Sequence, residues 1–271
     1  MLRVTLLFLI TTTLSIAADK PLYVFDNGAG RGELSMEEQT QLAKRTGYAG
    51  IFYAMPKNTP EFLAAHKSAG LRLLGIYTGM NVSDAKPGYD PALPAAIEQL
   101  KGTKAIIGFN VNGKAANGDD LAVATLREVA DMAAKAGLRV AIYPHYGMHV
   151  ARLEDALRII GKVQRPNVGL VFNLCHWLRS GDEPNLDLRL KQAAPHMYLA
   201  TISGSDHDGD WDRLIQPLDK GTYDVKGFVR KMEKAGYQGP VLLQCYNIKG
   251  DREQNLHASM KAWRGFWKQE R

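Results

Sequence analysis

The chain has 271 residues and a formal net charge of +6, and charged residues make up 23% of it. Basic and acidic residues are spread along the chain without long runs of one sign, so the composition does not predict binding to nucleic acid. The length suffices for one large hydrophobic core, and no low-complexity tract or change of composition marks a second domain.

The first eighteen residues resemble an export signal. Arg3 precedes an apolar stretch from Val4 to Ile16, and the small residues Ala17 and Ala18 follow. The stretch is shorter than the roughly 20 residues that a membrane-spanning helix needs. We therefore predict a signal peptide at 1–18, cleaved after Ala17 or Ala18, and a periplasmic or secreted mature protein without a stable membrane span.

One pattern recurs through the rest of the chain. An amphipathic segment ends at a glycine, and a short apolar segment follows, as in FLAAHKSAGLRLLGIYTG and VADMAAKAGLRVAIYPHYG. The pattern predicts a helix, its end, and a strand buried on both faces. The glycines at the predicted helix ends are Gly47, Gly70, Gly137 and Gly236.

Eight such apolar segments predict eight parallel strands. They are Leu22–Asp26, Gly50–Ala54, Arg72–Tyr77, Ala105–Asn110, Arg139–Pro144, Gly169–Asn173, Met197–Ser203 and Val241–Tyr246. Eight strands that alternate with helices indicate an α/β fold, a single (β/α)8 TIM barrel over 19–271.

An open doubly wound sheet is the alternative fold. Its best signal is DNGAGRGE after the first strand. That run lacks the glycine spacing of a dinucleotide-binding turn, so we interpret it as a flexible first loop of the barrel.

Polar and aromatic side chains gather at the predicted carboxyl ends of the strands, where TIM barrels build their sites. Amides, hydroxyls and aromatic rings are the groups that bind sugar hydroxyls and stack on sugar rings. We therefore expect a small-molecule carbohydrate as the ligand. The expected substrate-binding residues are Asp26, Tyr77, Asn110, Asn112, Tyr143, Asn173, Ser203, Gln244 and Tyr246.

Three segments resemble the xylose-isomerase-like TIM barrels, a superfamily of sugar isomerases, sugar epimerases and apurinic endonucleases. They are YPHYG, VGLVFNLCHWLRSGDEPNL and PLDKGTYDVKGFVRKMEKAGYQGPVLLQ. The resemblance covers most of the chain after the signal. It implies that His145 and His176 correspond to the family's histidines on strands five and six.

The same resemblance shows departures at the four metal-binding positions. Tyr143 stands for a glutamate, Asn173 for an aspartate and Gln244 for a second glutamate. Ser203 stands for a histidine, with Thr201 and Ser205 as alternative matches. Divalent ions such as Mg²⁺ need anionic oxygen ligands, so we expect no metal and no cofactor. The remaining way to bind a metal is a softer ion on His145, His176 and Asp206 or His207.

Loss of the two glutamates also removes the proton-transfer pair that the resemblance implies for the epimerases. The remaining candidates for acid or base catalysis are His145, His176, Asp206 and Lys249. The imidazoles are the strongest, because their pKa lies near neutral pH.

Three functions follow from these residues. The first is a sugar isomerase, epimerase or lyase that works without the family's metal. The second is a carbohydrate-binding barrel without activity. A nuclease is the third, and it would require the metal cluster that these positions do not supply.

Cys175 and Cys245 are the only cysteines. Two cysteines do not make a disulfide scaffold in a chain of this length, and we interpret them as buried thiols.

Overall fold

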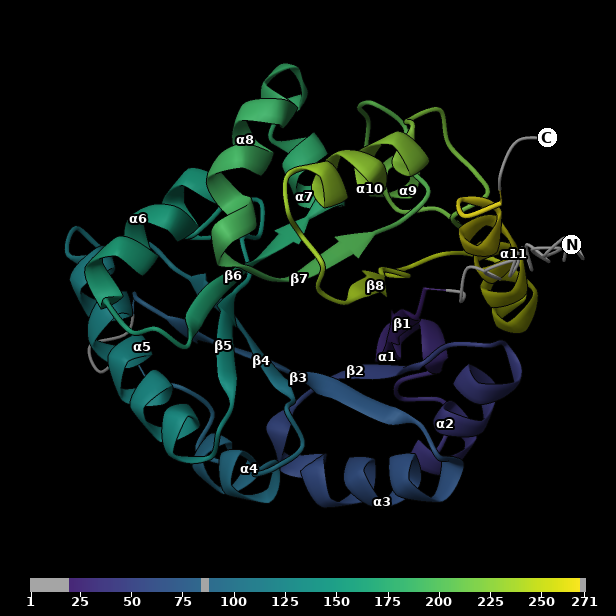
Figure 1. The fold of residues 1–271 in the computed structure, drawn as a ribbon. Coiled ribbons are helices and arrows are strands. Elements are labelled where there is room, and N and C mark those ends of the chain that lie inside the picture. The colour runs from purple at the N-terminus through teal and green to yellow at the C-terminus, as the bar shows by residue number, and fades with distance from the viewer. Residues whose placement is uncertain (1–19, 84–87, 269–271) are drawn as a thin grey trace, which may run out of the picture.

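Parallel strands form a closed ring with helices around it (Figure 1). The structure is a computed structural model that describes residues 20–83 and 88–268. The predicted signal peptide lies outside the described residues. The ring order follows the chain: β1 (Leu22–Phe25), β2 (Gly50–Ala54), β3 (Arg72–Asn81), β4 (Ile106–Asn112), β5 (Arg139–Ile142), β6 (Val168–Asn173), β7 (Met197–Ile202) and β8 (Val241–Leu243). The predicted (β/α)8 barrel is confirmed.

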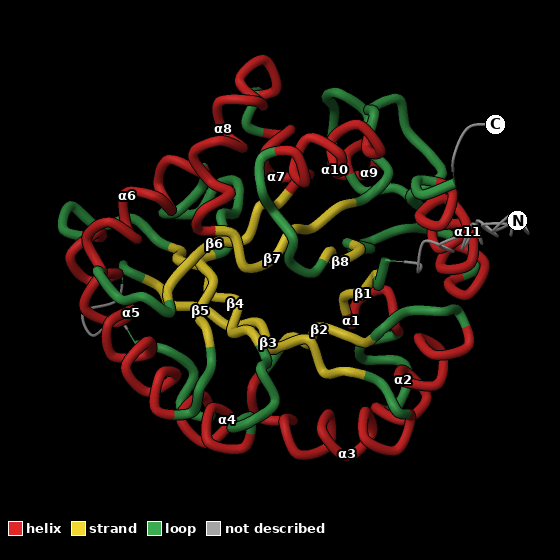
Figure 2. Tube along the Cα trace, in the orientation of Figure 1, coloured by secondary structure: helices red, strands yellow, loops and turns green. Residues whose placement is uncertain are grey.

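The α-helices lie outside the ring of strands (Figure 2). They are α1 (Asp26–Ala29), α2 (Met36–Arg45), α3 (Thr59–Ala69), α4 (Leu93–Gln99), α5 (Gly118–Lys135), α6 (Leu153–Val163), α7 (Leu174–Arg179), α8 (Leu186–Ala193), α9 (Trp211–Leu214), α10 (Val225–Lys234) and α11 (Arg252–Gly265). Short 3-10 turns lie at Pro56–Asn58, Glu183–Asn185 and Ala194–His196. Among the described residues, no helix is both long and apolar enough to cross a membrane.

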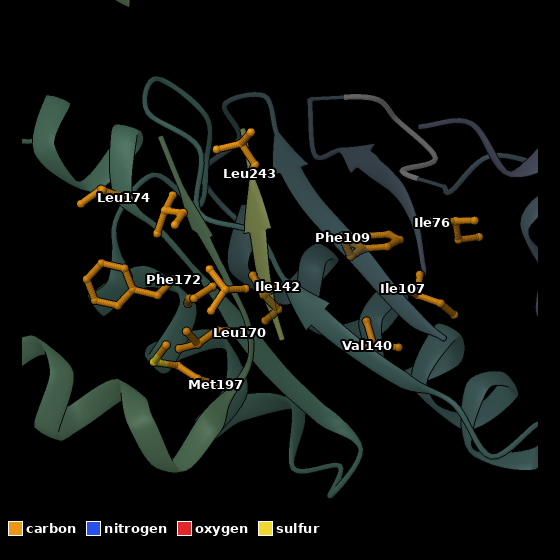
Figure 3. Packing of buried hydrophobic residues seen from close by; sticks show 14 of the residues in the cluster. Ile76, Ile107, Phe109, Val140, Ile142, Leu170, Phe172, Leu174, Met197 and Leu243 are labelled. Carbon is orange, nitrogen blue, oxygen red and sulfur yellow. The ribbon is translucent and has the colours of Figure 1, made fainter. Parts of the chain in front are cut away.

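The core has two layers, because successive side chains of a strand point to opposite faces. Phe25, Phe52, Leu74 and Tyr143 fill the inside of the barrel. Their neighbours along each strand pack outward against the helices, and Figure 3 shows part of this second layer. Tyr53 belongs to the outer layer, where its ring stacks on Phe62 of α3.

The helix-ending glycines have the backbone conformation expected from the sequence, whereas the segment after β1 differs from the expected loop. The four helix-ending glycines adopt positive φ, from 68° at Gly70 to 100° at Gly236, which confirms the predicted helix ends. The segment after β1 was expected to be a loop, but it begins with the helical turn α1 and reverses at Gly30, whose φ is 101°. Cys175 and Cys245 are free and buried, as interpreted.

Candidate functional site

A cavity of about 510 Å³ opens at the carboxyl ends of the strands. Residues of β1, β2 and β3 contribute to it, together with residues from the segments that follow β1, β5, β6, β7 and β8. Its lining consists of Phe25, Asn27, Arg31, Ala54, Tyr77, Tyr143, His145, Tyr146, His176, Trp211, Ile215, Gln244 and Tyr246. We call it the central cavity.

His145 and His176 lie side by side on one wall of the central cavity. Their ring centroids are 3.8 Å apart. His145 follows β5, and its backbone N–H donates to the carbonyl of Val150 at 3.0 Å. His176 lies in α7, directly after β6, and is buried. Both rings contact the backbone of Tyr146, which fixes their orientation.

The contacts with Tyr146 assign different tautomers to the two rings. The backbone N–H of Tyr146 donates to Nδ1 of His176 at 3.2 Å, so a neutral His176 carries its proton on Nε2. Nδ1 of His145 lies 3.2 Å from the carbonyl oxygen of Tyr146, to which it can only donate. Nε2 of His145 is then an acceptor. One wall of the cavity therefore presents a proton acceptor next to a proton donor.

Burial keeps both imidazoles neutral. Desolvation, and secondly the neighbouring His145, lowers the pKa of His176 to about 2. Desolvation also lowers the pKa of His145 below its ordinary value, and the bond to the Tyr146 carbonyl opposes that shift only in part. A neutral imidazole can act as a base at neutral pH, whereas an imidazolium cannot.

Aromatic rings enclose the space in front of the histidines. Trp211 meets His176 edge to face at 4.9 Å between centroids, and Tyr77 meets Tyr143 in the same way at 5.1 Å. The guanidinium of Arg179 lies over the rings of Tyr146 and Trp211. These rings provide the flat apolar surfaces that stack on sugar rings.

Amide groups lie on the side of the cavity formed by β1 and β8. Oε1 of Gln244 accepts hydrogen bonds from Nδ2 of Asn27 at 2.9 Å and from the backbone N–H groups of Cys245 and Tyr246. Oδ1 of Asn27 is buried without a partner among the described residues. An unsatisfied buried acceptor at a cavity is suited to a ligand hydroxyl.

A family profile with the description xylose isomerase-like TIM barrel matches residues 40–266. The chain belongs to this family. Two curated proteins, both named 3-dehydroshikimate dehydratase, from Pseudomonas aeruginosa and Pseudomonas putida, are each 24% identical to this chain over the matched part. The matches cover 62% and 56% of the chain, but only 26% and 24% of those proteins. The matched part is thus about a quarter of each relative's length.

Solved structures of the same barrel superimpose over most of the chain. A 3-keto-D-glucoside 4-epimerase from E. coli has a TM-score of 0.74 at 18% identity and covers 90% of this chain and 98% of its own. A D-allulose 3-epimerase from Methylomonas sp., solved with D-allulose, has a TM-score of 0.70 at 16% identity and covers 91% and 97%. At these identities the likeness establishes the fold.

The family's four metal-binding positions do not fit a divalent ion in this chain, because their polar atoms have protein partners. Oδ1 of Asn173 accepts from the hydroxyl of Thr201 at 2.9 Å, and the hydroxyl of Ser203 donates to the carbonyl of Leu214 at 3.0 Å. Oε1 of Gln244 already has three donors, and burial raises the pKa of Tyr143 well above 10. Within the described residues, no group of three His, Cys, Asp or Glu side chains could hold a metal.

Several residues expected at the site lie outside the central cavity. Asp206 pairs with Arg213 and accepts from Thr222, and these contacts lower its pKa. Lys249 is exposed and donates to the side chain of Asn247 at 2.7 Å. A softer metal ion was the alternative, bound by the two histidines with Asp206 or His207. Among the described residues these side chains do not form a group that could hold a metal ion. Asp206, His207 and Lys249 are therefore absent from the lining of the central cavity.

The strand-four asparagines and Asp26 border other surfaces. Asn110 and Asn112 line a shallow groove next to the central cavity, and Nδ2 of Asn110 contacts the hydroxyl of Tyr77. Asp26 is buried below the rim, where its carboxylate accepts from the backbone N–H of Ala54 at 2.9 Å. Burial raises the pKa of Asp26 to about 6 despite the nearby Arg31.

Sequence reasoning brought His145, His176, Tyr77, Tyr143, Gln244 and Tyr246 to one cavity. It missed Arg31, which follows the Gly30 turn and lines the same cavity. A basic residue directly after a glycine-rich strand-to-helix turn is the signal that could have found it.

Proposed function

We propose that this protein is an exported sugar-converting enzyme, an isomerase or lyase that moves a proton next to the carbonyl of a keto-sugar without a divalent metal. The observation that carries the proposal is the histidine pair: two neutral imidazoles on one cavity wall, one presenting an acceptor nitrogen and the other a donor.

The proton transfer follows from the tautomers. Nε2 of His145 takes the proton from the carbon next to the carbonyl, the C–H electron pair forms the C=C bond, and the carbonyl oxygen becomes an enolate oxygen. Nε2–H of His176 donates to an oxygen of the substrate. In an isomerisation, His176 protonates the enolate oxygen and then takes up the proton of the neighbouring hydroxyl, whose oxygen becomes the new carbonyl, while His145 returns its proton to the carbon that bore the first carbonyl. In an elimination, His176 protonates the hydroxyl on the β-carbon. This hydroxyl leaves as water with the electron pair of its C–O bond, and the enolate returns to a carbonyl.

The spacing of the histidines favours these two reactions over epimerisation. A two-base epimerase needs a base on each face of the reacting carbon, with the sugar between them. Here the ring centroids are 3.8 Å apart, which leaves no room for a sugar. Both proton transfers therefore take place on one face of the substrate.

Names of the relatives support a sugar-like substrate with a carbonyl group. They include a 3-keto-D-glucoside 4-epimerase, a D-allulose 3-epimerase and 3-dehydroshikimate dehydratases. The cavity offers what such ligands need, aromatic faces beside the free acceptor of Asn27.

The test is deuterium exchange in D2O, followed by proton NMR, with methyl 3-keto-glucoside, D-allulose and 3-dehydroshikimate as probes. We expect the wild type to exchange or convert at least one probe and His145→Ala to lose about 100-fold or more in rate. His257→Ala, on the outer helix α11, is the matched control and keeps the wild-type rate. Equal rates for His145→Ala and wild type would contradict the proposal.

A carbohydrate-binding barrel without activity is the second candidate. The aromatic wall and the amides of Asn27 and Gln244 support binding by themselves. The same probes discriminate the two functions, since saturable binding by calorimetry without exchange or conversion would favour the binder.

Export is proposed from the sequence pattern at 1–18. We expect the protein collected from the periplasm or medium of an expressing bacterium to begin at Ala18 or Asp19. Mass spectrometry of the intact protein measures this. A protein retained inside the cell that begins at Met1 would contradict export.

A further inference from the structure

Arg31 is the only side chain with a permanent charge among the described residues that line the central cavity. The two histidines are neutral, and the other lining groups are amides, phenols and apolar side chains. A reaction that creates a negative oxygen in this cavity therefore has one fixed positive charge in the cavity lining, whereas Arg179, which lies over the rings of Tyr146 and Trp211, is not part of that lining.

The turn after β1 positions Arg31 at the cavity. The backbone N–H of Arg31 donates to the carbonyl of Asp26 at 2.9 Å, which closes the turn of α1. Gly30 permits the reversal with its φ of 101°, and a side chain there would lie 2.8 Å from Leu34. The local backbone thus turns the chain back toward the end of β1.

Most of the guanidinium of Arg31 is available to a ligand. A guanidinium has five N–H donors, and among the described residues the Arg31 side chain makes one contact, from Nη1 to Oδ1 of Asp26 at 3.3 Å. The Arg31 side chain is 42% exposed. Its positive charge also reaches the hydroxyl of Tyr77, where it opposes the rise in pKa that burial causes.

Arg31 and the histidines lie on opposite sides of the cavity. In the closed ring β1 to β8, β1 is four strands from β5, and Figure 1 shows the two on opposite sides of the barrel. Arg31 follows β1 and His145 follows β5. A sugar in the cavity therefore lies between the base and the positive charge.

We propose that Arg31 is a further catalytic residue, which binds the carbonyl oxygen of the substrate and stabilises the negative charge that develops on it during proton abstraction. The inference rests on the proposed function. Arg31 would take the part that a divalent ion has in the family, as the resemblance implies. The arrangement selects substrates whose carbonyl faces β1 while the acidic C–H faces β5.

The first test is kinetic and uses the probe that the wild type exchanges. We expect Arg31→Gln to lower kcat by about 100-fold or more with a smaller change in KM, because the stabilised charge exists only in the transition state. Arg31→Lys should retain part of the rate, and added guanidinium ion should restore part of the rate of Arg31→Ala. Arg45→Gln, on the outer surface, is the control.

The second test does not depend on turnover. The carboxylate of D-gluconate is a planar anion that resembles an enediolate, and D-glucitol is its neutral counterpart. We expect the wild type to bind gluconate at least about 10-fold more tightly than glucitol and Arg31→Gln to lose that preference. Calorimetry measures both affinities, and thermal melting checks that each variant is folded.

The outcomes separate the two proposals. Exchange by the wild type that Arg31→Gln retains would overturn the role of Arg31 and leave the histidine mechanism in place. No exchange or conversion of any probe by the wild type would overturn the proposed function and, with it, a catalytic role for Arg31.

Discussion

His176 is a neutral imidazole buried against another imidazole, and its contribution to the free energy of unfolding depends on pH. Its pKa is about 2 in the folded protein and about 6.5 in an unfolded chain. Between these values the unfolded state binds more protons, so the free energy of unfolding falls as the pH drops below about 6.5.

We expect this group to remove about 2 kcal/mol of stability between pH 7 and pH 5. His176→Gln carries no titrating ring, so the stability of the wild type relative to this variant should fall by that amount over the same interval. Urea unfolding at the two pH values measures it. A constant difference would mean that His176 is not buried as described.

Asp26 has the opposite pH dependence. Burial raises the pKa of Asp26 to about 6, so the folded protein favours the neutral acid more than the unfolded chain does. The free energy of unfolding that this group contributes is lost as the pH rises through 6. Asp26→Asn keeps an oxygen for the N–H of Ala54 and does not ionise. Between pH 5 and pH 8, we expect the wild type to lose about 1.5 kcal/mol relative to this variant. Denaturant midpoints at both pH values test this, and no relative loss would place the pKa of Asp26 near its ordinary value.

For a single residue, the sequence predicts where it lies along a strand but not which group its side chain contacts. Asp206 follows β7 as predicted, yet it is paired with Arg213 of α9. Tyr53 and Tyr77 both lie near the carboxyl ends of the strands predicted from the sequence, but Tyr53 points to the helix layer whereas Tyr77 lines the cavity. The partner of a charged side chain and the inward or outward direction of a side chain are set by packing, which one sequence does not display.

Gly137 at a helix end and Gly75 within a strand should differ in how much stability an alanine substitution removes. Gly137 has a φ of 71° and open space around it, so Gly137→Ala should cost only the strain of the left-handed backbone, about 1 kcal/mol. A Cβ at Gly75 would lie 1.9 Å from the carbonyl oxygen of Ile106 on the neighbouring strand. Gly75→Ala should therefore cost more than about 3 kcal/mol or prevent folding. Thermal melting of the two variants measures the difference, and equal midpoints would contradict the strand spacing.

The eight strands were predictable because each is a short apolar run, and four of them, β2, β3, β5 and β8, follow the helix-ending glycines Gly47, Gly70, Gly137 and Gly236. Their carboxyl ends were less predictable. β5 and β8 end at Ile142 and Leu243, before the residues that turn into the cavity, whereas β3 and β4 continue as a pair to Asn81 and Asn112. Hydrogen bonds between neighbouring strands determine the residue at which each strand ends, and the pattern of apolar residues does not predict these hydrogen bonds.

Stability of the whole barrel should not depend on a divalent metal, because the family's ligand positions carry Tyr143, Asn173, Ser203 and Gln244. We expect neither chelator nor Mg²⁺, Mn²⁺ or Zn²⁺ to move the melting temperature by more than about 1 °C, since a ligand that binds the folded state must stabilise it. Elemental analysis of the purified protein is the companion measurement. Stoichiometric metal, or a melting temperature that falls with chelator, would contradict the metal-free site.

Lys20, the first described residue, lies at the end of the barrel away from the central cavity. The indole N–H of Trp263 in α11 donates to its carbonyl at 2.7 Å. Lys20 also borders a separate pocket with Arg72 and Val241, the first residues of β3 and β8. A barrel coupled to a bead or electrode through a linker placed just before Lys20 would therefore present its cavity to the solution.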